Sequence, residues 1–193
     1  MFLAQKLMSN ALAKTYATWN PSDKSVECAL TNGNLRAAFT TGVATGVYGC
    51  RATIGKSTGK WYWEVKYVSA TVVGFIVGIG TNGTTVNSYP GGSATSYGYY
   101  HNNGDKYNNG GHVGYGATWT TGDVIGIALD MDAGTLTFYK NGVSQGVAYS
   151  GITGTFYPFI GESNASATTV ADANFGASAF TYAVPSGYNA GVY

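Results

Sequence analysis

Residues 122–146, GDVIGIALDMDAGTLTFYKNGVSQG, decide the fold of this chain. Apolar residues alternate with smaller ones over 125–129, which is the period-2 pattern of a half-buried strand. A second alternating run ends at Asn141-Gly142, two residues that tolerate the positive φ of a type I′ hairpin turn. The stretch therefore predicts three antiparallel strands joined by two tight turns.

The composition indicates one β-rich domain with a short appendage. Of the 193 residues, 45% are hydrophobic and 10% are charged, against about 25% charged in an average domain. The 29 glycines and 16 tyrosines are typical of secreted or virion β-proteins. A net charge of +1 with scattered Lys and Arg excludes a nucleic-acid footprint, and no apolar run approaches the roughly 20 residues of a membrane span.

Residues 1–16, MFLAQKLMSNALAKTY, differ from the rest of the chain. Their apolar residues recur at helical spacing, so we expect an amphipathic helix or arm here, ahead of a β-domain at 17–193. Such an arm can attach to a partner or a neighbouring copy, or cover an edge of its own sheet. A signal peptide is the competing interpretation, but Gln5 and Lys6 interrupt its apolar region. The attachment residues would be Phe2, Leu3, Leu7, Met8 and Leu12.

From residue 17 the pattern is entirely β. Turn signals recur every 8–12 residues, which predicts a sandwich or barrel, and the tail after Pro185 is expected at the surface. Two long loops are predicted at 81–95 and 101–116. Besides the opening stretch, strands are predicted near 25–31, 34–40, 47–54, 60–68, 72–79, 96–100 and 154–160.

The two cysteines, Cys28 and Cys50, both fall in predicted strands. Two thiols cannot form a disulfide framework, and they lack a C-x-x-C spacing. Small core residues are the first interpretation, and a single Cys28–Cys50 bridge stays open because pairing cannot be deduced from sequence.

Several short motifs occur in a fixed order along the chain. Together with the L-D-x-x-x-G-T-L-x-F-Y-x-N-G pattern of 129–142, they resemble the SPRY (B30.2-like) domain family over roughly 17–188. The resemblance implies an all-β fold, a bent sandwich of two antiparallel sheets related to the concanavalin-like jelly roll. It also implies no catalysis, and recognition of peptide segments or other partners by loops at one end of the sandwich. The motifs are GKWYWEV at 59–65, VGIG at 77–80, SYGY at 96–99, GDVIG at 122–126 and NFG at 174–176.

The Ser, Thr, Gly and Asn character is similar to that of the small stand-alone SPRY modules of bacteriophage and prophage structural proteins. The run 25–39 with its N-G-N-L turn, followed by RATIGKS at 51–57, shares this similarity. It implies a location on the virion, as a tail-fibre, receptor-binding or capsid-decorating protein. The implied partners are other capsid or tail proteins, or a protein or glycan of the host surface, and a homo-oligomer is compatible with this role.

The tyrosine-rich loops at 81–95 and 101–116 are the predicted recognition surface. Tyr with Asn, Ser and Gly is the mixture used by antibody paratopes, because it combines rigid rings with adaptable hydrogen bonds. Sugars also stack on such rings. The alternative is that the tyrosines are strand residues and the loops are inert. The candidate ligand-binding residues are Tyr89, Tyr99, Tyr100, His101, Asn102, Asn103, Lys106, Tyr107 and Asn108.

Two other functions stay open at this point. One is a purely architectural capsid-decoration protein whose loops bind nothing. The other is a glycan-degrading enzyme that uses Glu64 and Glu162 as paired carboxylates, although Lys66 suggests a structural ion pair for Glu64.

No metal or cofactor is expected. The Asp130-Met131-Asp132-Ala133-Gly134 run starts like a calcium loop but lacks its closing Glu. The residues are therefore interpreted as turn formers, and His101 and His112 as solvated loop residues.

Overall fold

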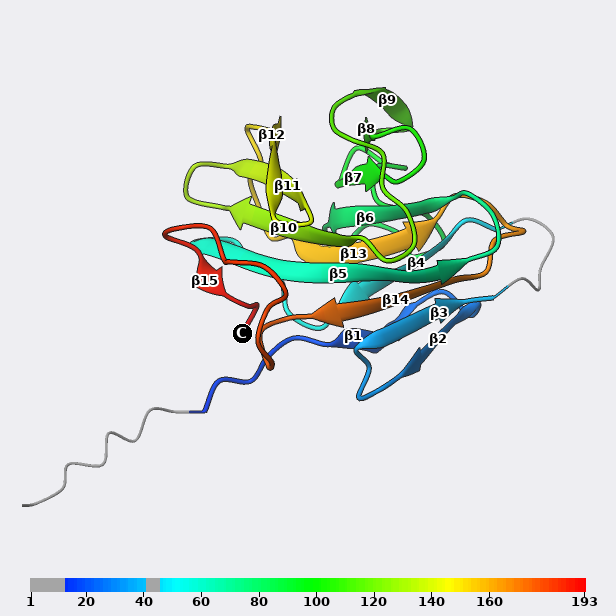
Figure 1. The fold of residues 1–193 in the computed structure, drawn as a ribbon, viewed down its shortest axis with the longest axis horizontal. Coiled ribbons are helices and arrows are strands. Elements are labelled where there is room, and N and C mark those ends of the chain that lie inside the picture. Colours follow the sequence, from blue (N-terminus) through cyan, green and yellow to red (C-terminus); the bar gives the residue numbers. More distant parts are fainter. Residues whose placement is uncertain (1–12, 41–45) are drawn as a thin grey trace, which may run out of the picture.

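The structure, a computed structural model, describes residues 13–40 and 46–193. Within these residues the chain forms two antiparallel sheets that pack face to face (Figure 1). None of the described segments forms a helix long and apolar enough to cross a membrane. Sheet A runs from edge to edge through β1 (Trp19–Lys24), β4 (Tyr48–Ala52), β13 (Tyr157–Glu162), β6 (Phe75–Gly80), β7 (Ser96–Tyr100), β8 (Asp105–Asn108) and β9 (Gly111–Gly114).

Sheet B contains the long central strand β5 and the opening stretch of sequence. β5 also pairs in parallel with the short β15 (Asn189–Ala190) near the end of the chain. From edge to edge sheet B runs through β12 (Val143–Tyr149), β11 (Thr135–Lys140), β10 (Val124–Asp130), β5 (Lys60–Ala70), β14 (Thr169–Asn174), β3 (Arg36–Phe39) and β2 (Cys28–Thr31).

The meander predicted at 122–146 is present as β10, β11 and β12. Asn141 and Gly142 have φ values of 49° and 79°, as the type I′ turn requires. The half-buried pattern expected for β10 is wrong, because every residue of this strand is buried. On its outer side a Cβ at Gly126 would lie 2.3 Å from the Tyr62 hydroxyl, so the strand is covered on both faces.

The core lies between the sheets, and β5 supplies several of its large side chains. Trp63, Val65 and Tyr67 point inward and are at most 2% exposed. Trp61 belongs to the same face but lies near the strand end, where it is half-buried and packs edge-on against Tyr193. The predicted inward face of this strand is therefore confirmed.

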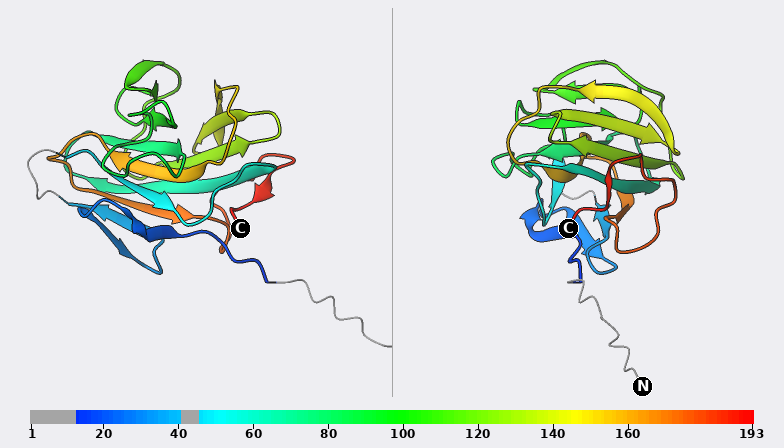
Figure 2. Two further views of the ribbon diagram at one scale, coloured as in Figure 1. Left: turned by 180° about the vertical axis from the view of Figure 1, so that it is seen from behind. Right: turned by 90° about the vertical axis from the view of Figure 1, so that its left-hand side faces the viewer.

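The C-terminal tail lies at the surface over most of its length, as predicted, but its end at 191–192 is buried. Val192 is fully buried, and its carbonyl accepts a hydrogen bond of 2.7 Å from the Ala17 N–H. The two ends of the described chain therefore lie side by side below β5 (Figure 2). The prediction fails at 191–192 because β15 pairs with β5 and the Gly191 N–H donates to the Tyr62 carbonyl at 3.0 Å, which draws this part of the tail into the fold.

The long loop predicted at 101–116 is wrong, because it contains the β8–β9 hairpin. Asn109 and Gly110, with φ values of 53° and 73°, form its two-residue turn. This Asn-Gly pair is the sequence signal for the hairpin turn. It is hard to recognise because it lies among other Asn and Gly residues and no alternating apolar residues flank it. The other predicted loop, 81–95, is a loop in the structure.

Both cysteines are buried and unbonded in this structure. The hydrogen bond with the Cys28 thiol, together with burial, raises the pKa of the Cys50 thiol. Small core residues are thus what the structure shows for both. The predicted arm residues Phe2, Leu3, Leu7, Met8 and Leu12 lie outside the described residues, and 13–16 have no regular secondary structure.

Candidate functional site: an aromatic rim on sheet A

Four aromatic side chains gather on the outer face of sheet A, the face turned away from sheet B. We call Tyr89, Tyr100, Tyr107 and His112 the rim patch. Tyr107 occupies its centre, with its ring stacked on His112 at 4.9 Å between centroids and edge-on to Tyr100 at 5.5 Å. Tyr89 meets Tyr107 edge-on at 6.4 Å. All four side chains remain partly exposed, so their rings form one continuous surface.

Close backbone packing fixes the rim patch in place. Gly91 has a φ of 91°, and a Cβ there would lie 2.3 Å from the Tyr107 carbonyl oxygen. A Cβ at Gly98 would lie 2.2 Å from the Pro90 carbonyl oxygen. Both glycines therefore let the 81–95 loop, which carries Tyr89, lie directly against β7 and β8.

The rim patch combines a polar margin around His112 with the phenol hydroxyls of Tyr89 and Tyr100. The His112 Nδ1 lies 2.7 Å from a carboxylate oxygen of Asp105, and the Asn103 amide donates to the same carboxylate at 2.8 Å. Burial raises the pKa of the Tyr89 and Tyr100 phenols. These hydroxyls are therefore neutral groups that can both donate and accept hydrogen bonds.

Two residues predicted for the site belong to the core instead. Tyr99 is fully buried, and its hydroxyl donates to the Ala117 carbonyl. His101 is 7% exposed, its Nε2 accepts from the Gly74 N–H, and its Nδ1 faces the Trp119 carbonyl. Burial lowers the pKa of His101, although the Trp119 carbonyl opposes this. The expectation of a solvated histidine is therefore wrong for His101 and holds only for His112.

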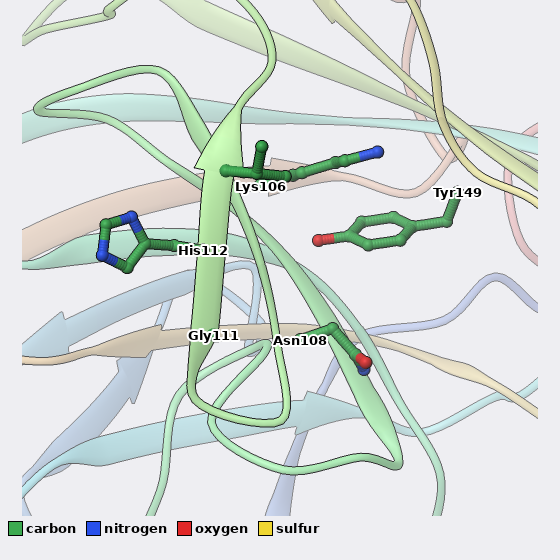
Figure 3. Close-up of a pocket in the computed structure, with 6 residues that line it drawn as sticks. Lys106, Asn108, Gly111, His112 and Tyr149 are labelled. Carbon is green, nitrogen blue, oxygen red and sulfur yellow. The ribbon is translucent and has the colours of Figure 1, made fainter.

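Lys106 and Asn108 lie on the inner face of the β8–β9 hairpin, opposite the rim patch. Figure 3 shows both side chains on the side that faces Tyr149, whereas the His112 ring lies on the other side. Lys106 Nζ donates to the Ala148 carbonyl at 2.5 Å, and the Asn108 amide donates to the Ser96 carbonyl at 2.8 Å. A hollow of about 210 Å³ lies beside them.

The remaining predicted residues lie in the exposed β7–β8 turn. Asn102 is exposed and follows the rim-patch residue Tyr100 by two positions. The Asn103 side chain accepts a hydrogen bond from the Asp105 N–H and so shapes the turn. The sequence prediction missed His112 and Tyr149. Tyr149 reaches from sheet B to the Tyr107 carbonyl at 2.8 Å. No local pattern predicts that contact.

The carboxylates of the hydrolase alternative do not form a pair. Glu64 lies on the outer face of sheet B, where it accepts the N–H groups of Thr181 and Tyr182 at 2.8 and 2.9 Å. Glu162 lies between the sheets and accepts the Thr169 hydroxyl at 2.5 Å. Because sheet B separates the two groups, they cannot flank one glycosidic bond. The predicted Glu64–Lys66 ion pair is also wrong, since Glu64 binds the C-terminal segment.

Replacing Glu64 by Gln is expected to loosen the C-terminal segment. The amide places a donor where two backbone N–H groups now point, so the free energy of unfolding should fall by about 2 kcal/mol. Hydrogen exchange over 177–183 should also accelerate. The half-exposed Glu27 offers the control Glu27→Gln, and equal denaturation midpoints for the two variants would refute this role of Glu64.

The Asp130–Gly134 run forms a turn in the structure. Asp130 accepts the N–H groups of Asp132 and Ala133, and its other oxygen lies 3.0 Å from Lys60 Nζ. Asp132 accepts the Gly59 N–H at 2.7 Å. The carboxylates are therefore occupied by structural bonds, as turn formers are. Within 13–40 and 46–193 no three His, Cys, Asp or Glu residues are grouped as metal ligands would be.

The sandwich and the rim patch together define a class of protein, a two-sheet frame that presents a partly exposed aromatic surface. The sequence profile described as SPRY domain matches residues 60–176, more than half of the chain. The chain therefore belongs to the SPRY domain family, a family of protein interaction modules. This confirms the predicted SPRY family and the predicted two-sheet fold, but it does not support the bacteriophage type of SPRY module.

Relatives and solved structures agree with this assignment. The chain is 36% identical over 174 residues to Ran-binding protein 9 of Xenopus laevis and 34% identical over 171 residues to that of Homo sapiens. These matches cover 86% of this chain but only 31% and 23% of the relatives, so the chain spans less than a third of their length. The SPRY domain of human HERC1 superimposes with a TM-score of 0.71 at 22% identity, over 80% of this chain and 96% of that domain.

Proposed function

We propose that this chain recognises an extended segment of a partner protein through the rim patch. One observation carries the proposal: three tyrosine rings and one imidazole converge on a single face, partly exposed and held by backbone packing. Aromatic residues dominate protein interfaces because they bury a large area at low entropic cost. A rigid β-frame behind them reduces the ordering that binding requires.

A peptide fits this surface better than a glycan does, because the chain belongs to a family of protein interaction modules. The predicted place on a phage particle and the attachment role of the N-terminal arm stay predictions. The relatives named above are eukaryotic proteins, and they give no support to a virion location.

The test uses a random 12-residue linear peptide library displayed on yeast, selected against the intact chain. Peptides that bind should lose affinity by about 30-fold or more when Tyr100 and Tyr107 are both replaced by Ala, as removal of hot-spot rings predicts. The unfolding midpoint should fall by only a few degrees, because both rings are partly exposed. The matched control is Tyr139→Ala, which removes a partly exposed ring on sheet B and should leave binding intact.

Three outcomes would overturn the proposal. One is a library that yields no binder, and another is a set of selected peptides that bind the folded double variant as tightly as the original chain. Binding to a glycan array with no peptide selected would replace the protein partner with a carbohydrate.

A further inference from the structure

Strand β9 is a sheet edge without the usual protection against pairing. Its four residues, Gly111–Gly114, are all exposed and include no proline, lysine, arginine, aspartate or glutamate. The β1 edge, in contrast, contains Pro21 and an irregular register, and β12 contains bulges and side-chain bonds to its backbone. Natural proteins use such devices to keep edge strands from pairing with other chains.

The hairpin register shows which backbone groups of β9 are free. Asn108 and Gly111 flank the two-residue turn and form its closing hydrogen-bonded pair. Bonding alternates along the strand, so His112 and Gly114 direct their N–H and C=O groups away from β8. In the described part of the chain these four groups have no partner. The backbone of an added strand would satisfy them.

Both faces beside this edge can receive alternate side chains. On the outer face an added strand would lie against His112 and the rest of the rim patch. On the inner face it would lie next to Val113, which is 57% exposed, and the hollow of about 210 Å³ in front of Tyr149 (Figure 3). Successive residues of a strand point to opposite faces, so one extended peptide reaches both surfaces.

The charge of the hollow indicates what enters it. Lys106 lines it, and among the described residues its ammonium group has no carboxylate partner, only the Ala148 carbonyl and the Tyr149 ring. Asp105 is not available to it, because this carboxylate lies on the other face with His112. An Asp or Glu of the incoming strand would therefore complement Lys106. A second copy of β9, Gly-His-Val-Gly, supplies no carboxylate and would leave Lys106 unpaired.

We propose that β9 accepts an extended partner peptide as an additional strand of sheet A, with an acidic side chain of that peptide in the Lys106 hollow and an alternate side chain on the rim patch. This inference rests on the proposed function and specifies its binding mode. Main-chain hydrogen bonds would supply affinity, and the two side-chain surfaces would supply specificity.

The first experiment examines the backbone of the bound state, with the library-selected peptides as probes. On binding, the amide hydrogens of His112 and Gly114 should become protected from exchange. Peptides with a single N-methyl group should lose binding at every second position, because alternate amides face β9.

The second experiment alters the chain. A proline at an edge position with a solvent-facing N–H is compatible with a strand, so Gly114→Pro should fold. It should bind about 10-fold more weakly than Gly114→Ala, which keeps the N–H and fits beside Asp105 at 3.9 Å. Lys106→Met should weaken binding of the original peptide but not of its Asp→Asn or Glu→Gln form.

The outcomes separate this inference from the proposed function. Unchanged exchange at His112 and Gly114, with equal affinities for the two Gly114 variants, overturns strand addition even if the Tyr100/Tyr107 variant loses binding. If that double variant also binds normally, the proposed function falls as well. Should Gly114→Pro fail to fold, the exchange and N-methyl measurements on the unmodified chain still decide.

Discussion

Replacing Arg51 by Met is expected to lower the free energy of unfolding by about 3 kcal/mol, which corresponds to a fall in melting temperature of roughly 10 °C. The Arg51 guanidinium is 3% exposed and forms two bonds with Asp23, at 2.7 and 2.8 Å. It also donates to the carbonyls of Thr81 and Thr84, both at 2.6 Å. Its removal takes the guanidinium from the Thr84 carbonyl and the Asp23 carboxylate, whereas the Thr81 carbonyl keeps its bond from the Thr84 N–H. Buried acceptors that lose their partner are costly.

The chain contains a control with almost the same geometry. Arg36 forms a two-bond pair with Asp172 at 2.6 and 2.7 Å, but its side chain is 43% exposed. Arg36→Met should therefore lower the free energy of unfolding far less than Arg51→Met, because solvent screens exposed ion pairs. Equal losses in the two variants, measured by chemical denaturation, would show that burial of Arg51 does not determine its contribution.

The same substitution should affect the candidate site. Arg51 ties β4 to the first residues of the 81–95 loop, and that loop carries Tyr89. Hydrogen exchange over 81–95 should therefore accelerate in Arg51→Met and stay unchanged in Arg36→Met. We expect peptide binding to weaken through the altered position of Tyr89.

The second large effect concerns pH. Glu162 is fully buried, and one of its carboxylate oxygens has no hydrogen-bond partner. Burial raises its pKa from 4.5 to about 8, against the lowering effect of the Thr169 hydroxyl and the Ser163 N–H. The folded chain thus keeps a proton that the unfolded chain loses near its ordinary pKa.

The sign of the effect follows from this difference. Below pH 4.5 Glu162 is protonated in both the folded and the unfolded state, so its titration does not reduce the free energy of unfolding. As the pH rises toward 8 only the folded state still binds the proton, so stability falls, and above about 8 it levels off. Since one pKa unit corresponds to about 1.4 kcal/mol, the loss reaches roughly 5 kcal/mol.

Glu162→Gln is the matched variant, because it removes the charge and keeps the shape. It should unfold at nearly the same denaturant concentration as the original chain at pH 5, and at a clearly higher concentration at pH 9. Comparing the two proteins at each pH cancels the titration of all other groups. Parallel stability curves from pH 5 to 9 would contradict a raised pKa of Glu162.

Much of the fold could be predicted from local pattern. The strands β5 and β10 and the Asn141-Gly142 turn are decided by neighbouring residues, which a sequence displays directly. The segments that cover the outer face of sheet B could not be predicted from local pattern. Glu64 binds Thr181 and Tyr182, more than 110 positions away, so its adjacent Lys66 suggested the wrong partner.

The site was predicted as a region, and its members were only partly correct. Tyr89, Tyr100 and Tyr107 come together, whereas Tyr99, one position away, points into the core. The prediction treated residues 101–116 as a loop and therefore did not apply the two-residue period of a strand to Lys106 and Asn108. With that period, their opposite orientation from Tyr107 follows.

The most direct test of the central claim is an aromatic NMR titration of the chain with a library-selected peptide. Binding at the rim patch predicts shifts for the ring signals of Tyr89, Tyr100, Tyr107 and His112. The signals of Tyr139 and Tyr182, beside the outer face of sheet B, should not move. Shifts confined to Tyr139 and Tyr182, with the four rim-patch signals unchanged, would contradict it.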